Sequence, residues 1–155
     1  MINIDPTDRR ILQLLQENAD YTNKEIAAQL GMSTTPIFER IKKLKVNGII
    51  KRVIAIVDKK ALGKTLTAYC NESLKVHAKD FLEKFEQDVA ELKEVQECYH
   101  IAGQYDYMLK VNTKDIDTYQ HFITKKLAGL ENIGNVQSSF VMKEIKHTYA
   151  IEAED

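Results

Sequence analysis

Hydrophobic residues recur at helical spacing near the start of the chain. In the segment "DPTDRRILQLLQENA", Ile11, Leu14 and Leu15 fall on one face of a helix. Asp5 is a suitable N-cap, and Pro6 suits the first helical position because a backbone N–H has no intrahelical partner there. The pattern predicts an amphipathic helix that begins directly after Asp5.

Two further short helices and a strand are predicted next. The segment "TNKEIAAQL" opens with Thr22 and Glu25 at the spacing of a capping box, and Gly31 suits its left-handed C-cap. The segment "STTPIFERIKKLKV" starts at the potential N-cap Ser33, and Gly48 is expected to end it. The following "IIKRVIAIVD" is rich in β-branched residues and predicts a strand. Three short helices followed by a strand are typical of a winged helix-turn-helix domain.

From residue 65 onward the hydrophobic period changes. In "LTAYCNESLKV" apolar residues alternate, as in a strand with one buried face. The segment "AKDFLEKFEQDVAEL" is helical, "VQECYHIAGQYDYMLKVNT" predicts two strands joined at Gly103–Gln104, "DIDTYQHFITKKLAGL" is again helical, and "NVQSSFVMKEIK" is a last strand. The order βαββαβ predicts a ferredoxin-like antiparallel sheet with both helices on one face. The expected fold class is α+β.

Charge divides the chain at the same place. Residues 1–64 hold twelve Lys/Arg against seven Asp/Glu, a balance of +5, whereas residues 65–155 hold ten against sixteen, a balance of −6. Such different blocks suggest different partners, with a polyanion favoured by the first. We therefore expect a winged helix-turn-helix domain over residues 1–50, a strand and hinge linker over 51–64, and a ferredoxin-like effector-binding and oligomerisation domain over 65–155.

Composition excludes several protein classes. No apolar run is long enough to span a membrane, and "MINIDPTDRR" lacks the order of a signal peptide. Cys70 and Cys98 are too few for a disulfide framework and are expected to be inert buried thiols. The four histidines show no metal-ligand spacing, so no metal site is predicted. These features together indicate a cytoplasmic protein.

The helix that begins after Ser33 carries the first candidate site. Its buried stripe is Ile37, Ile41 and Leu44, and its outer face offers hydroxyl groups first and ammonium groups later. A basic solvent-facing helix with an ordinary Glu39–Lys43 pair is the alternative. The preceding capped helices and the run of basic residues favour a helix that reads the DNA major groove. The predicted DNA contacts are Ser33, Thr34, Thr35, Phe38, Glu39, Arg40, Lys42, Lys43, Lys51 and Arg52.

Three segments carry a resemblance to a known family. "DPTDRRILQLLQENA", "EIAAQLGMSTTPIFERIKKLKVNGIIK" and "YHIAGQYDYMLKV" resemble the Lrp/AsnC, or feast/famine, family of transcription regulators over essentially the whole chain. The last segment matches the family's strand–GxxD–strand element. The resemblance implies binding of double-stranded DNA, sensing of a small amino acid without any cofactor, a homodimer formed through the sheet, and an octamer of four dimers.

The turn at Gly103, Gln104, Tyr105 and Asp106 carries the second candidate site. Free backbone N–H groups can hold a carboxylate and an Asp can meet an ammonium group, so the turn suits a zwitterion. A plain hairpin, in which Asp bonds to its own backbone, is the alternative that the residues alone favour. The family resemblance favours amino-acid binding here. It also implies that Gln137, Ser138 and Ser139 of a neighbouring subunit complete the site.

Glu72 interrupts the apolar face of its predicted strand. Two interpretations remain open from the sequence: a tolerated residue at a strand end, or a partner for a lysine from another subunit.

The sequence disfavours two other functions for the acidic half. An acylphosphatase-like hydrolase needs an arginine in a phosphate cradle, and residues 65–155 contain no arginine. An RNA-binding sheet is disfavoured by the balance of −6 and by the lack of a basic–aromatic signature on the central strands. A DNA-binding regulator that is not an enzyme is the function predicted.

Overall fold

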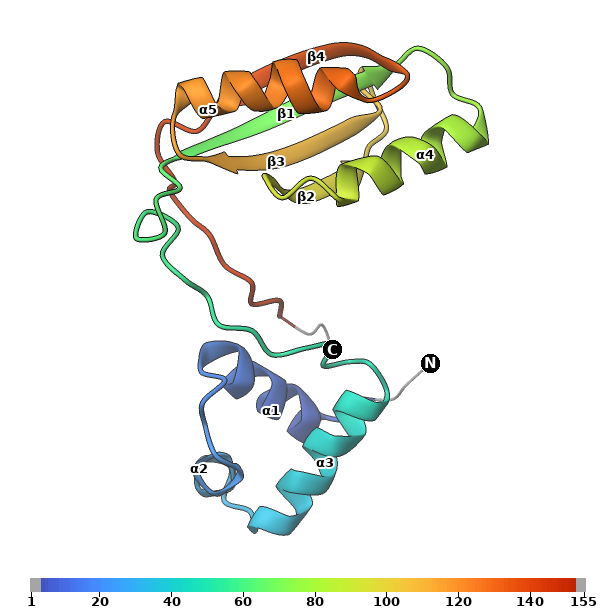
Figure 1. The fold of residues 1–155 in the computed structure, drawn as a ribbon. Helices are drawn as coiled ribbons and strands as arrows, with labels where there is room; N and C mark the ends of the chain where they lie inside the picture. Colours follow the sequence, from blue (N-terminus) through green and yellow to red (C-terminus); the bar gives the residue numbers. More distant parts are fainter. Residues whose placement is uncertain (1–3, 153–155) are drawn as a thin grey trace. The chain divides into compact units, whose positions relative to one another are not determined.

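The computed structural model describes residues 4–152, and they divide into two compact units (Figure 1). Within the described range, one unit contains residues 4–56 together with 146–152, and the other is Val57–Ile145. Each unit has its own hydrophobic core.

The first unit is built from three capped helices, α1 (Pro6–Glu17), α2 (Asn23–Leu30) and α3 (Thr34–Val46). The Asp5 carboxylate accepts from the backbone N–H of Asp8 at 2.8 Å, and Thr22 and Glu25 form the expected capping box. Gly31 ends α2 in the left-handed conformation, with φ +63°. Ser33 occupies the N-cap of α3 without a side-chain hydrogen bond. The three predicted helices are confirmed, as are the capping side chains at Asp5 and Thr22, whereas Ser33 takes the N-cap position without capping.

Apolar side chains from all three helices meet in one cluster. Its buried members are Ile11, Leu14, Ile26, Ala27, Ile37, Ile41 and Leu44. Because the inner stripe of α3 is fixed in this core, the opposite face of α3 is held outward, toward solvent.

The strand predicted for "IIKRVIAIVD" is wrong. Residues 51–58 are extended but belong to no ladder in the described chain, and a turn follows at residues 59–63. A strand needs a hydrogen-bonded neighbour, and β-branched composition alone does not supply one.

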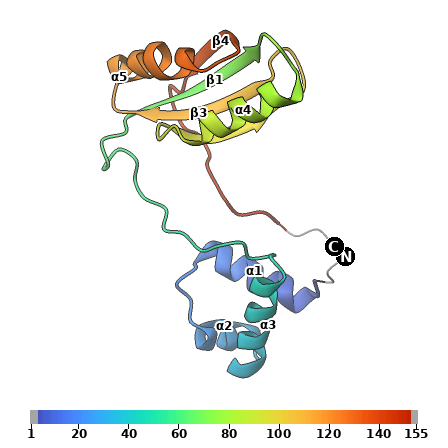
Figure 2. The ribbon, with the colours of Figure 1, turned by 45° about the vertical axis from the view of Figure 1, so that its right-hand side comes forward.

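The second unit has the predicted βαββαβ order. Its elements are β1 (Leu66–Leu74), α4 (Lys79–Ala90), β2 (Val95–His100), β3 (Tyr107–Thr113), α5 (Ile116–His121), a π turn (Phe122–Lys126), a 3₁₀ turn (Leu127–Gly129) and β4 (Ile133–Phe140). The strands pair antiparallel in the order β2-β3-β1-β4, and the two helices cover one face of the sheet (Figures 1 and 2). The ferredoxin-like prediction is confirmed.

The helix-covered face of the sheet forms the core of this unit. Ala68, Cys70 and Leu109 pack with Phe85 of α4 and Phe122 of the α5 segment. Cys70 is buried as predicted, but Cys98 is exposed, because β2 is an edge strand. The prediction of a buried thiol at Cys98 is therefore wrong.

Glu72 lies inside this core. It is the seventh of the nine residues of β1 and is 0 % exposed, so the interpretation as a strand-end residue is wrong.

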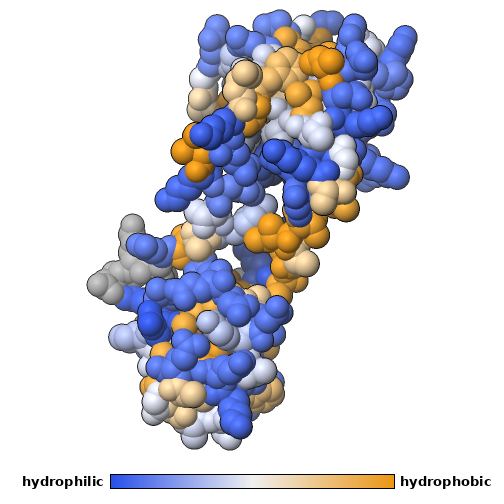
Figure 3. Space-filling model, turned by 90° about the vertical axis from the view of Figure 1, so that its left-hand side faces the viewer, coloured by the Kyte–Doolittle hydropathy of each residue, from blue (hydrophilic) through white to orange (hydrophobic). Residues whose placement is uncertain are grey.

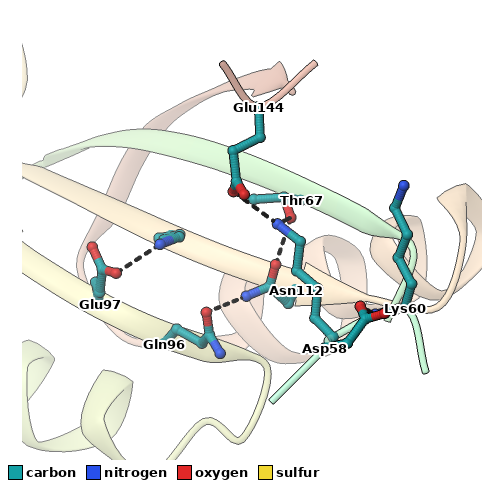
Figure 4. Close-up of polar contacts among 9 residues, drawn as sticks. Asp58, Lys60, Thr67, Gln96, Glu97, Asn112 and Glu144 are labelled. Atoms are coloured by element: carbon teal, nitrogen blue, oxygen red, sulfur yellow. Dashed lines mark hydrogen bonds and ion pairs between the residues drawn. The ribbon is translucent and has the colours of Figure 1, made fainter. Parts of the chain in front are cut away.

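The opposite face of the sheet carries a polar network (Figure 4). The Nζ atom of Lys59 donates to the hydroxyl of Thr67 at 3.1 Å and lies 3.2 Å from the Glu144 carboxylate. Thr67 donates to the Oδ1 atom of Asn112 at 2.6 Å, and Asn112 donates to Gln96. Lys59, on the segment that enters the unit, thus bonds both to Thr67 of β1 and to Glu144 on the segment that leaves it.

Candidate DNA-binding surface and ligand-binding loop

The outer face of α3 is open to solvent. Ser33, Thr34, Thr35, Phe38, Glu39, Lys42 and Lys43 are all exposed. Glu39 and Lys43 form no ion pair with each other in the part of the chain that the structure describes. The ordinary i,i+4 pair of the alternative interpretation is therefore not formed, and the ammonium groups remain available for an anion.

Phe38 is the aromatic residue of this face, and 49 % of its surface is exposed. It borders a shallow hollow of about 260 Å³ lined by Asn23, Phe38, Ile41, Lys42, Lys45 and Val46. The outer face of α3 therefore combines hydroxyl groups, one aromatic ring and ammonium groups, which are side chains suited to base edges and to phosphates.

Arg40 is engaged within the domain. Its Nη1 atom donates to the carboxylates of Asp5 at 2.5 Å and Asp8 at 2.7 Å, and Asp8 is buried. The pKa of Asp5 is lowered, first by the backbone N–H of Asp8 and then by Arg40. Arg40 thus ties α3 to the start of α1. Arg40 was predicted from the sequence as a DNA contact, and these two acceptors were missed, although Asp5 and Asp8 follow the spacing of a capping box.

Lys51 and Arg52 lie outside the helices. Both are exposed on the extended segment that follows α3, close in sequence to its basic last turn.

The second candidate site is the loop of residues 101–106 between β2 and β3. Gly103 has φ +148°, a conformation that favours glycine, and a Cβ atom there would meet nothing within 4 Å. The space beside Gly103 and Gln104 is open, as a site for a small ligand requires. A larger residue at 103 would act by straining the backbone, because no neighbouring atom is close enough to clash.

Asp106 fixes this loop to the end of β1. Its backbone N–H donates to the carbonyl of Glu72 at 2.8 Å, and its carboxylate accepts from the N–H of Leu74 at 2.7 Å. The Nε2 atom of His77 lies 2.9 Å from the same carboxylate. The Leu74 hydrogen bond is the main reason that the pKa of Asp106 is lowered, and His77 adds to it. Sequence reasoning missed Leu74 and His77, because contacts across strands have no local signal.

The three residues of β4 predicted to complete the site divide between the two faces of the sheet. Tyr105 donates from its hydroxyl group to Gln137, so the loop and β4 meet within one chain. Ser139 pairs with Tyr69 on the same open face and is exposed. Ser138 faces the core instead, where it accepts from the hydroxyl of Tyr119 at 2.5 Å.

Comparisons with known proteins agree with this architecture. Residues 4–51 match the family model described as winged helix-turn-helix DNA-binding, and residues 67–151 match the Lrp/AsnC ligand binding domain. The chain belongs to the Lrp/AsnC family of transcription regulators. Its two units correspond to the DNA-binding and ligand-binding parts that this family combines, so the resemblance noted in the sequence is confirmed.

Individual relatives match over nearly the whole chain. The transcriptional regulator AzlB of Bacillus subtilis is 36 % identical over 154 residues, which cover 99 % of this chain and 98 % of AzlB. A transcriptional regulator from Neisseria meningitidis, solved as a complex with L-methionine, matches with a TM-score of 0.92 at 35 % identity over 96 % of each chain. AsnC of Escherichia coli matches with a TM-score of 0.89 at 31 % identity over 98 % of this chain and all of that one.

Membrane-spanning helices and metal sites were also sought among the described residues. Between residues 4 and 152, no helix has both the length and the apolar character needed to cross a membrane. The same residues contain no group of His, Cys, Asp and Glu side chains placed to hold a metal ion.

Proposed function

We propose that this Lrp/AsnC regulator binds duplex DNA through α3 and that an amino acid bound at loop 101–106 changes that binding. The observation that carries the first part is the exposed outer face of α3, on which Thr35 and Phe38 precede Lys42. The N-terminal residues of a recognition helix reach base edges, and the later cations meet phosphates. Lys51 and Arg52 add phosphate contacts, and Arg40 acts by positioning α3.

The phosphate contact is tested by the salt dependence of DNA binding. Lys42→Ala should weaken binding to every duplex and reduce the slope of log K against log salt by about one unit. Lys93→Ala, which removes an exposed lysine of the other unit, is the matched control and should leave the slope unchanged. An unchanged slope for Lys42→Ala would remove α3 from the phosphate contacts.

The base contact of Phe38 is tested with modified DNA. The apolar feature that the major groove offers is the methyl group of thymine, so we assign the exposed Phe38 ring to that methyl. Replacing a contacted thymine by uracil should weaken wild-type binding roughly fourfold, the value of one buried methyl group. The same replacement should not affect Phe38→Ala. Equal losses for both proteins would contradict the assignment.

The amino-acid site is proposed at loop 101–106 because its backbone is open at Gly103 and a fixed carboxylate lies at Asp106. Since the N. meningitidis regulator was solved with L-methionine, methionine is the first ligand to test. Asp106→Asn keeps an acceptor for Leu74 while removing the charge, so calorimetry should show weakened amino-acid binding. Asp117→Asn, at an exposed position of α5, is the control. Unaltered binding by Asp106→Asn would place the ligand elsewhere.

The remaining proposals concern assembly and cellular role. We infer a homodimer, with assembly to an octamer of four dimers, because one sheet face has no covering helix among the described residues and because Val53, Ile54, Ile56 and Val57 are exposed on the segment that follows α3. Hydrophobic side chains also lie on the molecular surface in Figure 3. Apolar stretches of this kind usually mark interfaces. We place the regulator in the cytoplasm, with DNA and an amino acid as partners and with no catalytic role.

A further inference from the structure

Glu72 is a buried carboxyl group without a hydrogen-bond partner in the part of the chain that the structure describes. The residue is 0 % exposed, and neither Oε1 nor Oε2 has a hydrogen-bond partner among the described residues. Its neighbours along the same face of β1 are Cys70 and Leu74, both in the core. Natural cores rarely leave a polar group in this state, so its presence calls for a functional explanation.

The described titratable groups closest to Glu72 offer it no positive charge. Cys70 lies two residues away on β1, Cys98 on β2 and Tyr119 on α5, and each is close enough to be affected by the charge of Glu72. Tyr107, its partner in register on β3, donates to the Glu86 carboxylate of α4 at 2.8 Å. The facing residues of β4, Val136 and Ser138, do not titrate in this range. All titratable groups in this set are acids.

The two histidines at this end of the sheet are engaged elsewhere. His77 contacts Asp106, and the His100 ring stacks on Tyr107 with a centroid distance of 4.7 Å. Burial alone therefore acts on Glu72, and it raises the pKa of this carboxyl from 4.5 to about 8. Burial thus favours the neutral form of Glu72 in the folded protein.

The strand segment that carries Glu72 also holds the ligand loop. The carbonyl of Glu72 accepts from the Asp106 N–H, and the Leu74 N–H donates to the Asp106 carboxylate. We propose that Glu72 is an internal proton-binding site: when protonated it lets β1 pack and hold loop 101–106, and when it loses its proton at alkaline pH it loosens both.

The direction of the pH effect follows from linkage. Because the pKa of Glu72 is higher in the folded than in the unfolded protein, the contribution of Glu72 to the free energy of unfolding is most favourable at acid pH. That contribution declines as pH rises from about 5 to about 8 and is then constant. Loop 101–106 should lose protection as Glu72 itself ionises in the folded protein, around pH 8. A parallel loss of amino-acid affinity rests on the ligand site proposed above, whereas the loss of stability does not.

The experiment compares the full-length protein with Glu72→Gln, which keeps the shape of a protonated carboxyl group. Thermal and urea unfolding are measured from pH 5.5 to 9. The unfolding equilibrium constant of the wild type, divided by that of the variant, should rise by up to about tenfold per pH unit until about pH 8. Glu91→Gln, an exposed carboxylate of the same unit, should follow the wild type. A difference in unfolding free energy between the wild type and Glu72→Gln that does not change with pH would overturn the proposal.

Two readouts do not depend on the variant's stability alone. Carbon-13 NMR of the wild type should show one Glu carboxyl titrating near pH 8; titration of every Glu below pH 6 would overturn the proposal. Hydrogen exchange, corrected for its intrinsic pH dependence, should show loop 101–106 less protected at pH 8.5 than at 6.5 in the wild type but not in Glu72→Gln. If these results hold while methionine and the other amino acids bind equally at both pH values, the proton site stands and the ligand site at the loop fails.

Discussion

Arg40 and Glu72 are both ionisable side chains, but only Arg40 has ion-pair partners among the described residues. Arg40 bridges Asp5 and Asp8, so the nearly buried Asp8 carboxylate has a cation within 2.7 Å. Glu72 has no such partner among the described residues, and burial raises its pKa to about 8. The local sequence predicted neither the pairing of Arg40 nor the lack of a partner at Glu72, because both depend on side chains from other elements.

Replacing Arg40 tests its positioning role. Arg40→Ala should destabilise the first unit by about 1–3 kcal/mol, the usual cost of leaving a buried polar group without its partner. Hydrogen exchange of α1 and α3 amides, together with urea unfolding, measures this loss. Lys43→Ala, on the exposed side of α3, should change stability by less than about 0.5 kcal/mol. If Arg40→Ala keeps full protection yet loses one phosphate contact in the salt slope, Arg40 is a DNA ligand rather than a positioning residue.

The elements of this chain were largely predictable because their start and stop signals are local. The first two helices were predicted from the capping residues Asp5 and Thr22 and from Gly31, which ends α2. Strand β1 was predicted from alternating apolar residues. The strand expected after α3 did not form because, despite its β-branched composition, no described strand pairs with it. The break of α5 into a π turn and a 3₁₀ turn also has no signal in the hydrophobic pattern.

The irregular pairing of β1 with β4 gives a prediction at this scale. Leu74 pairs with Ile133 and Ser73 with Asn135, which leaves Gly134 as the extra residue of a bulge. A Cβ atom at Gly134 would lie 2.8 Å from the carbonyl oxygen of Ser73. Gly134→Ala should therefore destabilise the second unit by about 1–3 kcal/mol in equilibrium unfolding.

Gly129 provides the control for this substitution. A Cβ atom there meets nothing within 4 Å, so Gly129→Ala should be within about 0.5 kcal/mol of wild type. Equal stability of the two variants would mean that the bulge relaxes to admit a side chain.

At the scale of the whole molecule, the candidate sites were only partly predictable. The exposed outer face of α3 followed from helical periodicity, and the open loop at Gly103 followed from a glycine between two strands. The loop's attachment to Leu74 and His77, and the turning of Ser138 into the core, depend on strand order and register. These features arise from tertiary pairing and could not be read from local sequence.

Assembly supplies a further prediction at this scale. If the uncovered sheet face and the exposed apolar segment at residues 53–57 are interfaces, light scattering at micromolar concentration should show a dimer or a larger even-numbered assembly. Ile54→Asp and Ile56→Asp together should shift the population toward monomer, while Lys93→Asp, at an exposed polar position, should not. A monomeric wild type would exclude two-fold recognition of a palindromic site.

The central claim is that one chain couples amino-acid binding to DNA binding. Fluorescence anisotropy with a duplex selected from random sequence tests it directly, titrated at several salt concentrations with and without L-methionine and then the other standard amino acids. We expect salt-dependent binding whose affinity one amino acid changes by at least about fivefold, and we expect Asp106→Asn to lose that change while keeping its basal affinity. Selection of no duplex, or an affinity that no amino acid alters, would contradict it.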